Sequence, residues 1–136
     1  MKTQTTEENY ALENAKSQLA SIVEMVAELR KQESAQDSDE AREAAQNAIQ
    51  EDPLLVEVRF DWYCLGTESD SRPAKFRILL TTGGPACQIV GTLDAHMQPE
   101  SAIIQYQDWG VPWTDYARSC DNDSLLEYCR QLYFGE

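Results

Sequence analysis

Residues 76–93 carry the pattern that most constrains the fold of this chain. Two short runs on either side of Gly83-Gly84-Pro85 place apolar or small residues at every second position, as strands with one buried face do. These residues are Phe76, Ile78, Leu80, Cys87, Ile89, Gly91 and Leu93. Glycine accepts a positive φ and proline cannot donate to a ladder, so the residues between the runs suit a chain reversal. The segment is predicted to be a β-hairpin at the centre of a sheet.

A long helix is predicted from residue 7 onward. Its apolar residues recur at alternating spacings of three and four, which forms an a/d seam. The residues proposed for self-association through this seam are Leu12, Leu19, Ile22, Val26 and Leu29. An isolated helix of this length is marginal, so the seam is expected either to fold back on its own domain or to pair with a second copy as a coiled coil.

Polar residues follow this helix and divide the chain into two parts. Residues 32–39 have no strong apolar side chain and form the best linker candidate. The predicted organisation is a helical arm and linker over residues 1–36 and an α+β core domain over residues 37–136. A second helix is predicted to begin near Asp37 or Ser38 and to stop before Pro53.

The predicted sheet has four strands. Residues 54–63 form the first, with Val56, Val58, Phe60 and Trp62 expected to face the core.

The central hairpin supplies the next two strands, and a fourth strand contains Ile103 and Ile104. Residues 108–114 are predicted to be a loop because they include glycine and proline, and a last helix opens at residues 121–124. The order α-α-β-β-β-β-α with short connections favours an α+β fold. It is expected to be a four-stranded antiparallel meander with helices on one face and the long N-terminal helix as an arm.

The charge of the chain bears on its partners. Eleven Lys and Arg against 24 Asp and Glu give a net charge of −13, and the acidic residues are spread along the sequence. Direct binding of nucleic acid needs a basic surface, so this balance argues against it. The acidity provides solubility or imitates a polyanion.

The sequence also bears on location. No apolar run has the length of a signal peptide or of a bilayer-spanning helix, so neither a membrane partner nor export is expected and a cytoplasmic location is predicted. The four cysteines match no metal pair or disulfide framework, and most are expected to be reduced thiols.

The most unusual local composition lies in residues 107–116. Trp109 and Trp113 can form an exposed aromatic platform ringed by Asp108 and Asp115, suited to a protein interface. Alternatively the rings close one end of the core, which is favoured because small domains seldom expose so much apolar area. A split, with one ring buried and one exposed, is also open.

No catalytic, cofactor or metal site is predicted. His96 is the only histidine, and a triad of Cys87, His96 and Asp108 has no pattern to support it. The glycine pair near residue 83 lacks the lysine and the spacing of a phosphate-binding loop.

Several segments resemble a known family. They are Ile49-Gln50-Glu51-Asp52-Pro53 with Val56-Glu57-Val58-Arg59, Phe76-Arg77-Ile78-Leu79-Leu80-Thr81-Thr82-Gly83-Gly84-Pro85-Ala86, and Tyr106-Gln107-Asp108-Trp109-Gly110-Val111-Pro112-Trp113-Thr114. Residues 40–136 resemble a family of small acidic proteins encoded by bacteriophages and prophages, which has no established activity. The resemblance implies a phage-type context inside a bacterial host cell and contributes no catalytic residue.

Charge and resemblance together lead to a first hypothesis. The chain is a non-enzymatic, acidic interaction protein that binds and blocks a basic, nucleic-acid-handling host protein, as an anti-defence or host-takeover inhibitor or a DNA mimic. The residues proposed to bind the partner are Glu57, Asp61, Asp108, Trp109, Trp113 and Asp115. The alternative is a structural or regulatory homodimer assembled through the N-terminal helix, and the third is a small enzyme acting through Cys87 or through acids near Trp109.

Overall fold

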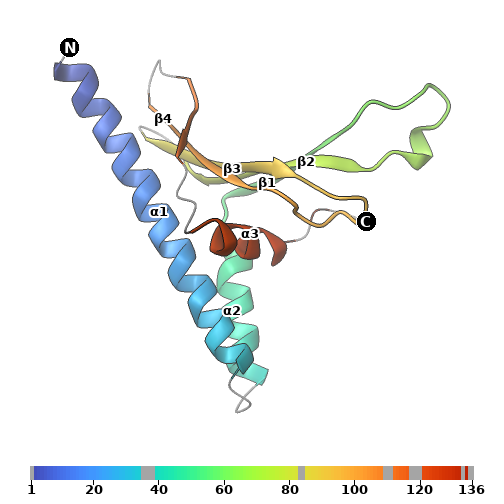
Figure 1. The fold of residues 1–136 in the computed structure, drawn as a ribbon, viewed down its shortest axis with the longest axis horizontal. Coiled ribbons are helices and arrows are strands. Elements are labelled where there is room, and N and C mark those ends of the chain that lie inside the picture. Colours follow the sequence, from blue (N-terminus) through green and yellow to red (C-terminus); the bar gives the residue numbers. More distant parts are fainter. Residues whose placement is uncertain are drawn as a thin grey trace.

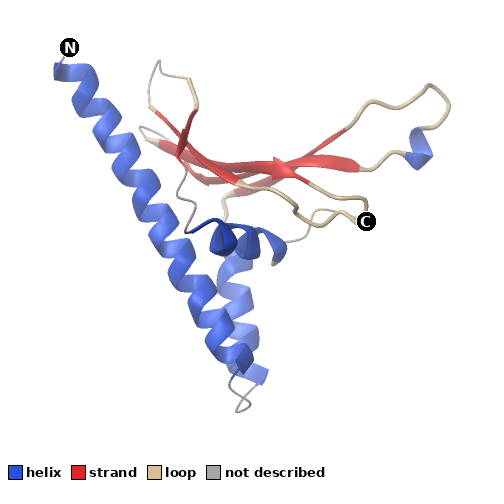
Figure 2. Ribbon diagram, in the orientation of Figure 1, coloured by secondary structure: helices blue, strands red, loops and turns tan. Residues whose placement is uncertain are grey.

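The computed structural model describes residues 2–34, 39–82, 85–108, 112–116, 121–132 and 134. Helices and a single sheet form two layers (Figures 1 and 2). The helical elements are α1 Lys2–Ser34, α2 Asp39–Glu51, the short 3₁₀ helix η1 Glu68–Asp70 and α3 Asn122–Arg130. The strands are β1 Leu55–Phe60, β2 Pro73–Thr81, β3 Ala86–Thr92, β4 Ile103–Gln107 and β5 Thr114–Tyr116.

The sheet is an antiparallel meander in the order β1-β2-β3-β4-β5. The central hairpin is confirmed as β2 and β3, with Ile78 opposite Ile89. Its predicted turn residues Gly83 and Gly84 lie outside the described residues. The prediction of four strands is wrong, because Thr114–Tyr116 forms a fifth strand on β4. Three residues are too few to produce a visible alternation, and this strand follows Pro112 closely.

The α-helices lie on one face of the sheet (Figure 1). Helix α1 contacts β3 and β4 as well as α2 and α3, and its apolar stripe from Ala11 to Leu29 is buried. The predicted seam therefore packs within the chain, in the same cluster as the sheet residues. Helix α2 is described from Asp39, while the proposed start at Asp37 or Ser38 lies outside the described residues.

The core lies between the helices and the middle of the sheet. Ile78, Ile89 and Ile104 stand opposite one another on β2, β3 and β4, and all three are almost completely buried. Beside this row the Phe76 ring lies over Gly91, where an added Cβ would overlap the ring and the Ser101 carbonyl oxygen. Position 91 therefore requires glycine for close approach rather than for an unusual φ.

The prediction that β1 faces the core is wrong for most of its apolar residues. Val58 is 39% exposed, Phe60 is 48% exposed, and Trp62, beyond the end of the strand, is 97% exposed. Val56 and Val58 stand opposite the buried Ile78 and Phe76, so they do point to the helical side. These side chains remain partly exposed to solvent because β1 is the edge strand and the helices cover the middle of the sheet.

Candidate interaction site

The residues predicted to bind a partner lie at opposite edges of the sheet. Glu57 is on β1 and Asp61 follows it, whereas Asp108, Trp113 and Asp115 belong to the β4 and β5 side. Four strand spacings separate β1 from β5, which is roughly 19 Å. Trp109 lies outside the described residues. The structure therefore does not gather the described members of this set into one patch.

On the β5 side Asp115 is hydrogen-bonded within the chain. Asp115 Oδ1 accepts a hydrogen bond from Gln105 Nε2 (2.8 Å), and Gln105 Oε1 accepts one from Gln88 Nε2 (2.8 Å). Gln88 is only 5% exposed, so the chain of amides satisfies a buried polar side chain. Trp113 is half-buried. Asp115 and Gln105 therefore have a structural role here, and their part in binding a partner stays a prediction.

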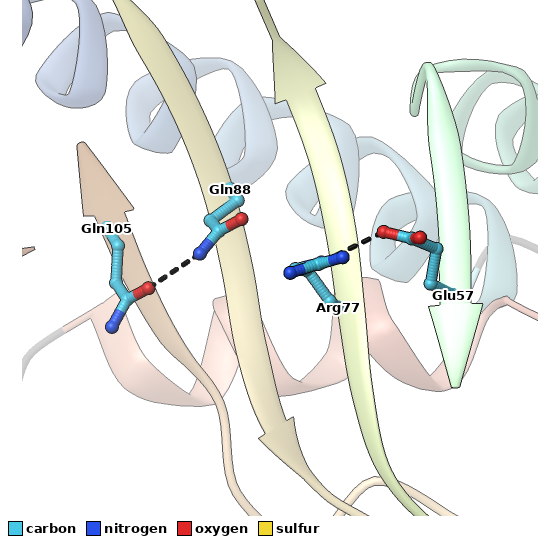
Figure 3. A network of polar contacts seen from close by, with 4 residues as sticks. All are labelled: Glu57, Arg77, Gln88 and Gln105. Atoms are coloured by element: carbon cyan, nitrogen blue, oxygen red, sulfur yellow. Dashed lines mark hydrogen bonds and ion pairs between the residues drawn. The ribbon is translucent and has the colours of Figure 1, made fainter. Parts of the chain in front are cut away.

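On the β1 side Glu57 is held by a neighbouring strand. Arg77 Nε donates to Glu57 Oε1 at 2.9 Å, and this hydrogen bond with the carboxylate charge raises the pKa of the guanidinium. Figure 3 shows this pair beside Gln88 and Gln105 on the sheet face that the helices leave open. Glu57 and Arg77 thus form one polar pair on that open face, and Gln88 and Gln105 form a second.

The same open face contains a hollow of about 580 Å³ near β1. Its lining combines charged and apolar residues and includes Glu57, Arg59, Lys75, Arg77, Val90 and Ile103. Arg59 stands directly opposite Lys75, and neither side chain has an ion pair within the described part of the chain. Like charges in this position are unfavourable. Three basic residues of this acidic protein, Arg59, Lys75 and Arg77, therefore line a hollow on the face that the helices do not cover.

Residues 61–72, here called the 61–72 loop, carry the two most exposed large hydrophobic side chains of the described residues. Trp62 is 97% exposed and Leu65 is 95% exposed, on a segment that projects away from the two layers (Figure 1). Asp61 and Glu68 are exposed on the same loop. The aromatic platform expected near Trp109 and Trp113 stays a prediction, because Trp109 lies outside the described residues, and the 61–72 loop is a second place where exposed apolar side chains have acidic neighbours in the sequence.

Internal hydrogen bonds order the 61–72 loop. The backbone N–H and the hydroxyl of Thr67 both donate to the Cys64 carbonyl, at 3.0 and 2.6 Å, and Gly66 provides the positive φ of 89° that this turn uses. Ser71 donates from its backbone N–H and its hydroxyl to the Glu68 carbonyl. The exposed side chains are therefore presented by a structured loop.

Two further contacts define the charge and the anchorage of this loop. Backbone N–H groups of Glu68 itself and of Gly66 face the Glu68 carboxylate and hold its pKa below the usual value. Arg72 Nη1 donates to the Ala95 carbonyl at 3.0 Å, which ties the base of the loop to the connection between β3 and β4. Glu68 is therefore charged at neutral pH.

The sequence contained a weak signal for this site. The alternation of β1 continues to Trp62 when it is read as one strand, although the strand ends at Phe60. Leu65, isolated among polar residues and followed by Gly66, fits no apolar face. An apolar residue in a turn that cannot be buried is the observation that could have identified the loop.

The residues predicted for self-association lie on α1 and face the interior. Leu19, Ile22, Val26 and Leu29 are buried in the chain's own core, and Leu12 is half-buried. Pairing two copies through them would uncover the part of the core that they fill.

The groups considered for catalysis are not assembled. Cys87 is fully buried and burial raises the pKa of its thiol to about 12, so it is protonated at neutral pH. His96 lies beyond the opposite end of β3 from Cys87. Within the described ranges, no three His, Cys, Asp or Glu side chains are grouped so that they could hold a metal ion.

Comparisons with protein-family models, with curated proteins and with solved structures find no match to this chain. Among its described helices, none combines the length and the apolar character needed to cross a bilayer.

Proposed function

We propose that this chain is a non-enzymatic, acidic interaction protein that binds a basic, nucleic-acid-handling protein through the 61–72 loop and blocks it. The observation that carries the proposal is the nearly complete exposure of Trp62 and Leu65 on an ordered loop with acidic neighbours. Small monomeric domains seldom leave such side chains in water without a use.

Physical chemistry gives each part of the loop a role. Tryptophan is among the residues that dominate interface energetics, and Leu65 extends the apolar surface beside it. The internal hydrogen bonds around Thr67 and Ser71 lower the entropic cost of ordering the loop when it binds. Asp61 and Glu68 favour a partner with basic groups around an apolar pocket.

The helical layer supplies a wider acidic field. Its exposed carboxylates include Glu24, Glu28, Glu33, Asp39, Glu40 and Glu43 on α1 and α2. Such a field accelerates encounter with a basic surface and makes binding sensitive to salt. The phage-type resemblance of residues 40–136 favours a host protein as the partner. Blocking would follow if the acidic chain occupied the surface that nucleic acid uses.

Affinity capture from a bacterial lysate tests this proposal. The tagged wild type is compared with Trp62→Ala and Leu65→Ala variants, and Tyr10→Ala serves as a matched control because Tyr10 is an exposed aromatic residue on α1. We expect the wild type and the control to retain a basic, nucleic-acid-binding protein, whereas the two loop variants lose it by at least about tenfold, as for a hot-spot truncation. Added double-stranded DNA should displace the captured protein.

Two outcomes would contradict the proposal. One is capture that does not change between low and moderate salt, and the other is capture that the loop variants retain in full. A Trp113→Ala variant tests the site first predicted, and loss of capture by that variant alone would move the interface to the β5 side. Protection of Cys64 from alkylation in the complex gives an independent readout, because this exposed thiol lies in the 61–72 loop.

A further inference from the structure

Strand β1 is an exposed edge of the sheet. One of its sides pairs with β2, and no described strand lies along the other. An edge strand presents unpaired backbone groups, and natural proteins usually protect such edges by shortness, proline or cover. Here β1 has six residues without proline, and Leu55, Val58 and Phe60 are exposed.

Within a single copy, only one of the two charged residues of β1 has an oppositely charged partner among the described residues. Glu57 faces Arg77 and forms an ion pair, while Arg59 faces Lys75 and has no acidic partner within the described residues. An acid placed on the outer side of Arg59 would relieve this unfavourable pair. The strand itself contains that acid two residues away, at Glu57.

We propose that two copies of this chain pair antiparallel through β1, with Val58 opposite Val58 of the second copy. This symmetric register places Glu57 opposite Arg59 of the second copy, and the converse pair forms at the same time. A register centred on Glu57 or on Arg59 would place identical charges opposite each other, which is unfavourable.

The faces of the two sheets agree with this register. Residues directly opposite each other in antiparallel strands share a face, so Val56 meets Phe60 of the second copy on the helical side. The charged pairs lie together on the open side, beside the hollow that Glu57, Arg59 and Lys75 line. The two sheets then form one continuous antiparallel sheet, and the exposed apolar residues of β1 become partly covered. The interface is isologous, as expected for a twofold dimer.

This inference does not depend on the proposed function, because the test changes β1 and leaves Trp62 and Leu65 unaltered. Sedimentation and light scattering on the full chain compare wild type with Glu57→Arg and with Arg59→Glu. Each reversal puts like charges opposite each other at both symmetric positions, so we expect dimerisation to weaken by at least about tenfold. Exposed residues on α1 supply matched controls in Glu24→Arg and Arg30→Glu, which should dimerise as the wild type does.

Mixing the Glu57→Arg and Arg59→Glu variants is the decisive experiment. In a mixed dimer the arginine introduced at position 57 of one copy faces the glutamate introduced at position 59 of the other. The unaltered Arg59 of the first copy faces the unaltered Glu57 of the second, so both pairs become complementary. We expect the mixture to associate more tightly than either variant alone, by about the same factor of ten. This recovery would not occur if the reversals merely damaged the fold.

Three results would overturn the inference. A wild type that stays monomeric at the highest soluble concentration removes the dimer. A dimer that both reversals leave unchanged places the interface elsewhere, on the α1 seam or the open face. Variants that dissociate but do not recover on mixing exclude this register of β1.

Discussion

The two edges of the sheet are built differently. Strand β5 has three residues, and its outward polar side chain Asp115 is tied to Gln105 by a hydrogen bond. Strand β1 has six residues, and its apolar side chains remain exposed. The β5 edge has the short length that protects a sheet from further pairing. The contrast teaches that the described β5 edge has its polar side chain hydrogen-bonded within the chain, whereas the β1 edge leaves apolar side chains exposed.

Along one row of opposite residues, burial also decreases from the middle of the sheet toward its edges. Val56, Ile78, Ile89, Ile104 and Tyr116 stand opposite one another across the five strands. The three isoleucines in the middle are buried, while Val56 and Tyr116 are half-buried. The next residue of β1 on this face, Val58, is more open still. The helical layer thus covers the middle of the sheet and leaves the β1 edge incompletely covered.

The largest effect should separate the middle of the sheet from its β1 edge. We expect Ile89→Ala to lower the free energy of unfolding by about 2 to 5 kcal/mol, because it leaves a cavity in a filled core. Val58→Ala should cost less than about 1 kcal/mol in the monomer, because Val58 is already 39% exposed. Urea denaturation at a concentration where wild type is monomeric measures both. Equal losses would show that β1 is as well covered as β3.

Raising the pH should also distinguish the buried middle of the sheet from the exposed loop after β1, because a buried and an exposed thiol ionise differently. Burial raises the pKa of Cys87 from 9.0 to about 12, whereas the unfolded chain releases this proton near its ordinary value. Above pH 9 the native state therefore binds more protons than the unfolded state. The contribution of Cys87 to the free energy of unfolding is fully present below pH 9. It falls by about 1.4 kcal/mol per pH unit for this group as the pH rises toward 12. Burial also raises the pKa values of Cys129 and Tyr128, which act in the same direction.

Denaturation midpoints between pH 8 and pH 11 check this expectation. Cys87→Ala should reduce the slope of the pH dependence and leave the part that Cys129 and Tyr128 contribute, whereas Cys64→Ala should leave the slope unchanged, because Cys64 is exposed in the loop that follows β1. A stability that is constant across this range would contradict the burial of the Cys87 thiol.

The smallest effect concerns the ion pair on β1. Glu57→Gln removes the charge that faces Arg77, but both side chains are about half-exposed, so the monomer should lose no more than about 1 kcal/mol. The same variant should weaken self-association, because Glu57 also faces Arg59 of the second copy in the proposed dimer. A thermal melt of the monomer and a dilution series separate the two effects. A large loss of monomer stability would give Glu57 a structural role instead.

Much of the fold could be predicted because periodic patterns record which residues share a face. The spacing of three and four in α1 identified Leu19, Ile22, Val26 and Leu29, which are buried, and the alternation around residue 83 identified the central hairpin. A periodic pattern does not show which element or molecule each apolar face packs against. The α1 seam permitted either the chain's own sheet or a second copy, and only tertiary packing decides between them.

The candidate site was harder to predict for the same reason. The alternation at Val56, Val58 and Phe60 correctly assigned one side of β1, but it could not show that the helices leave this side open. The same alternation extends to Trp62 and places it in the core, although the strand ends at Phe60. Gln88 shows the converse, since this polar residue lies on the open face and is nevertheless buried, with its amide satisfied by a hydrogen bond to Gln105.

The packing of α1 also affects how the chain is made. Helix α1 precedes the rest of the fold in synthesis, yet its buried stripe contacts β3 and β4, and β4 ends at Gln107. During translation its apolar side chains can be covered by α2 alone until most of the chain has emerged. Long-range contacts of this kind form late and leave intermediates that are prone to association. The sheet strands that bury the apolar stripe of α1 are therefore present only after most of the chain has been synthesised.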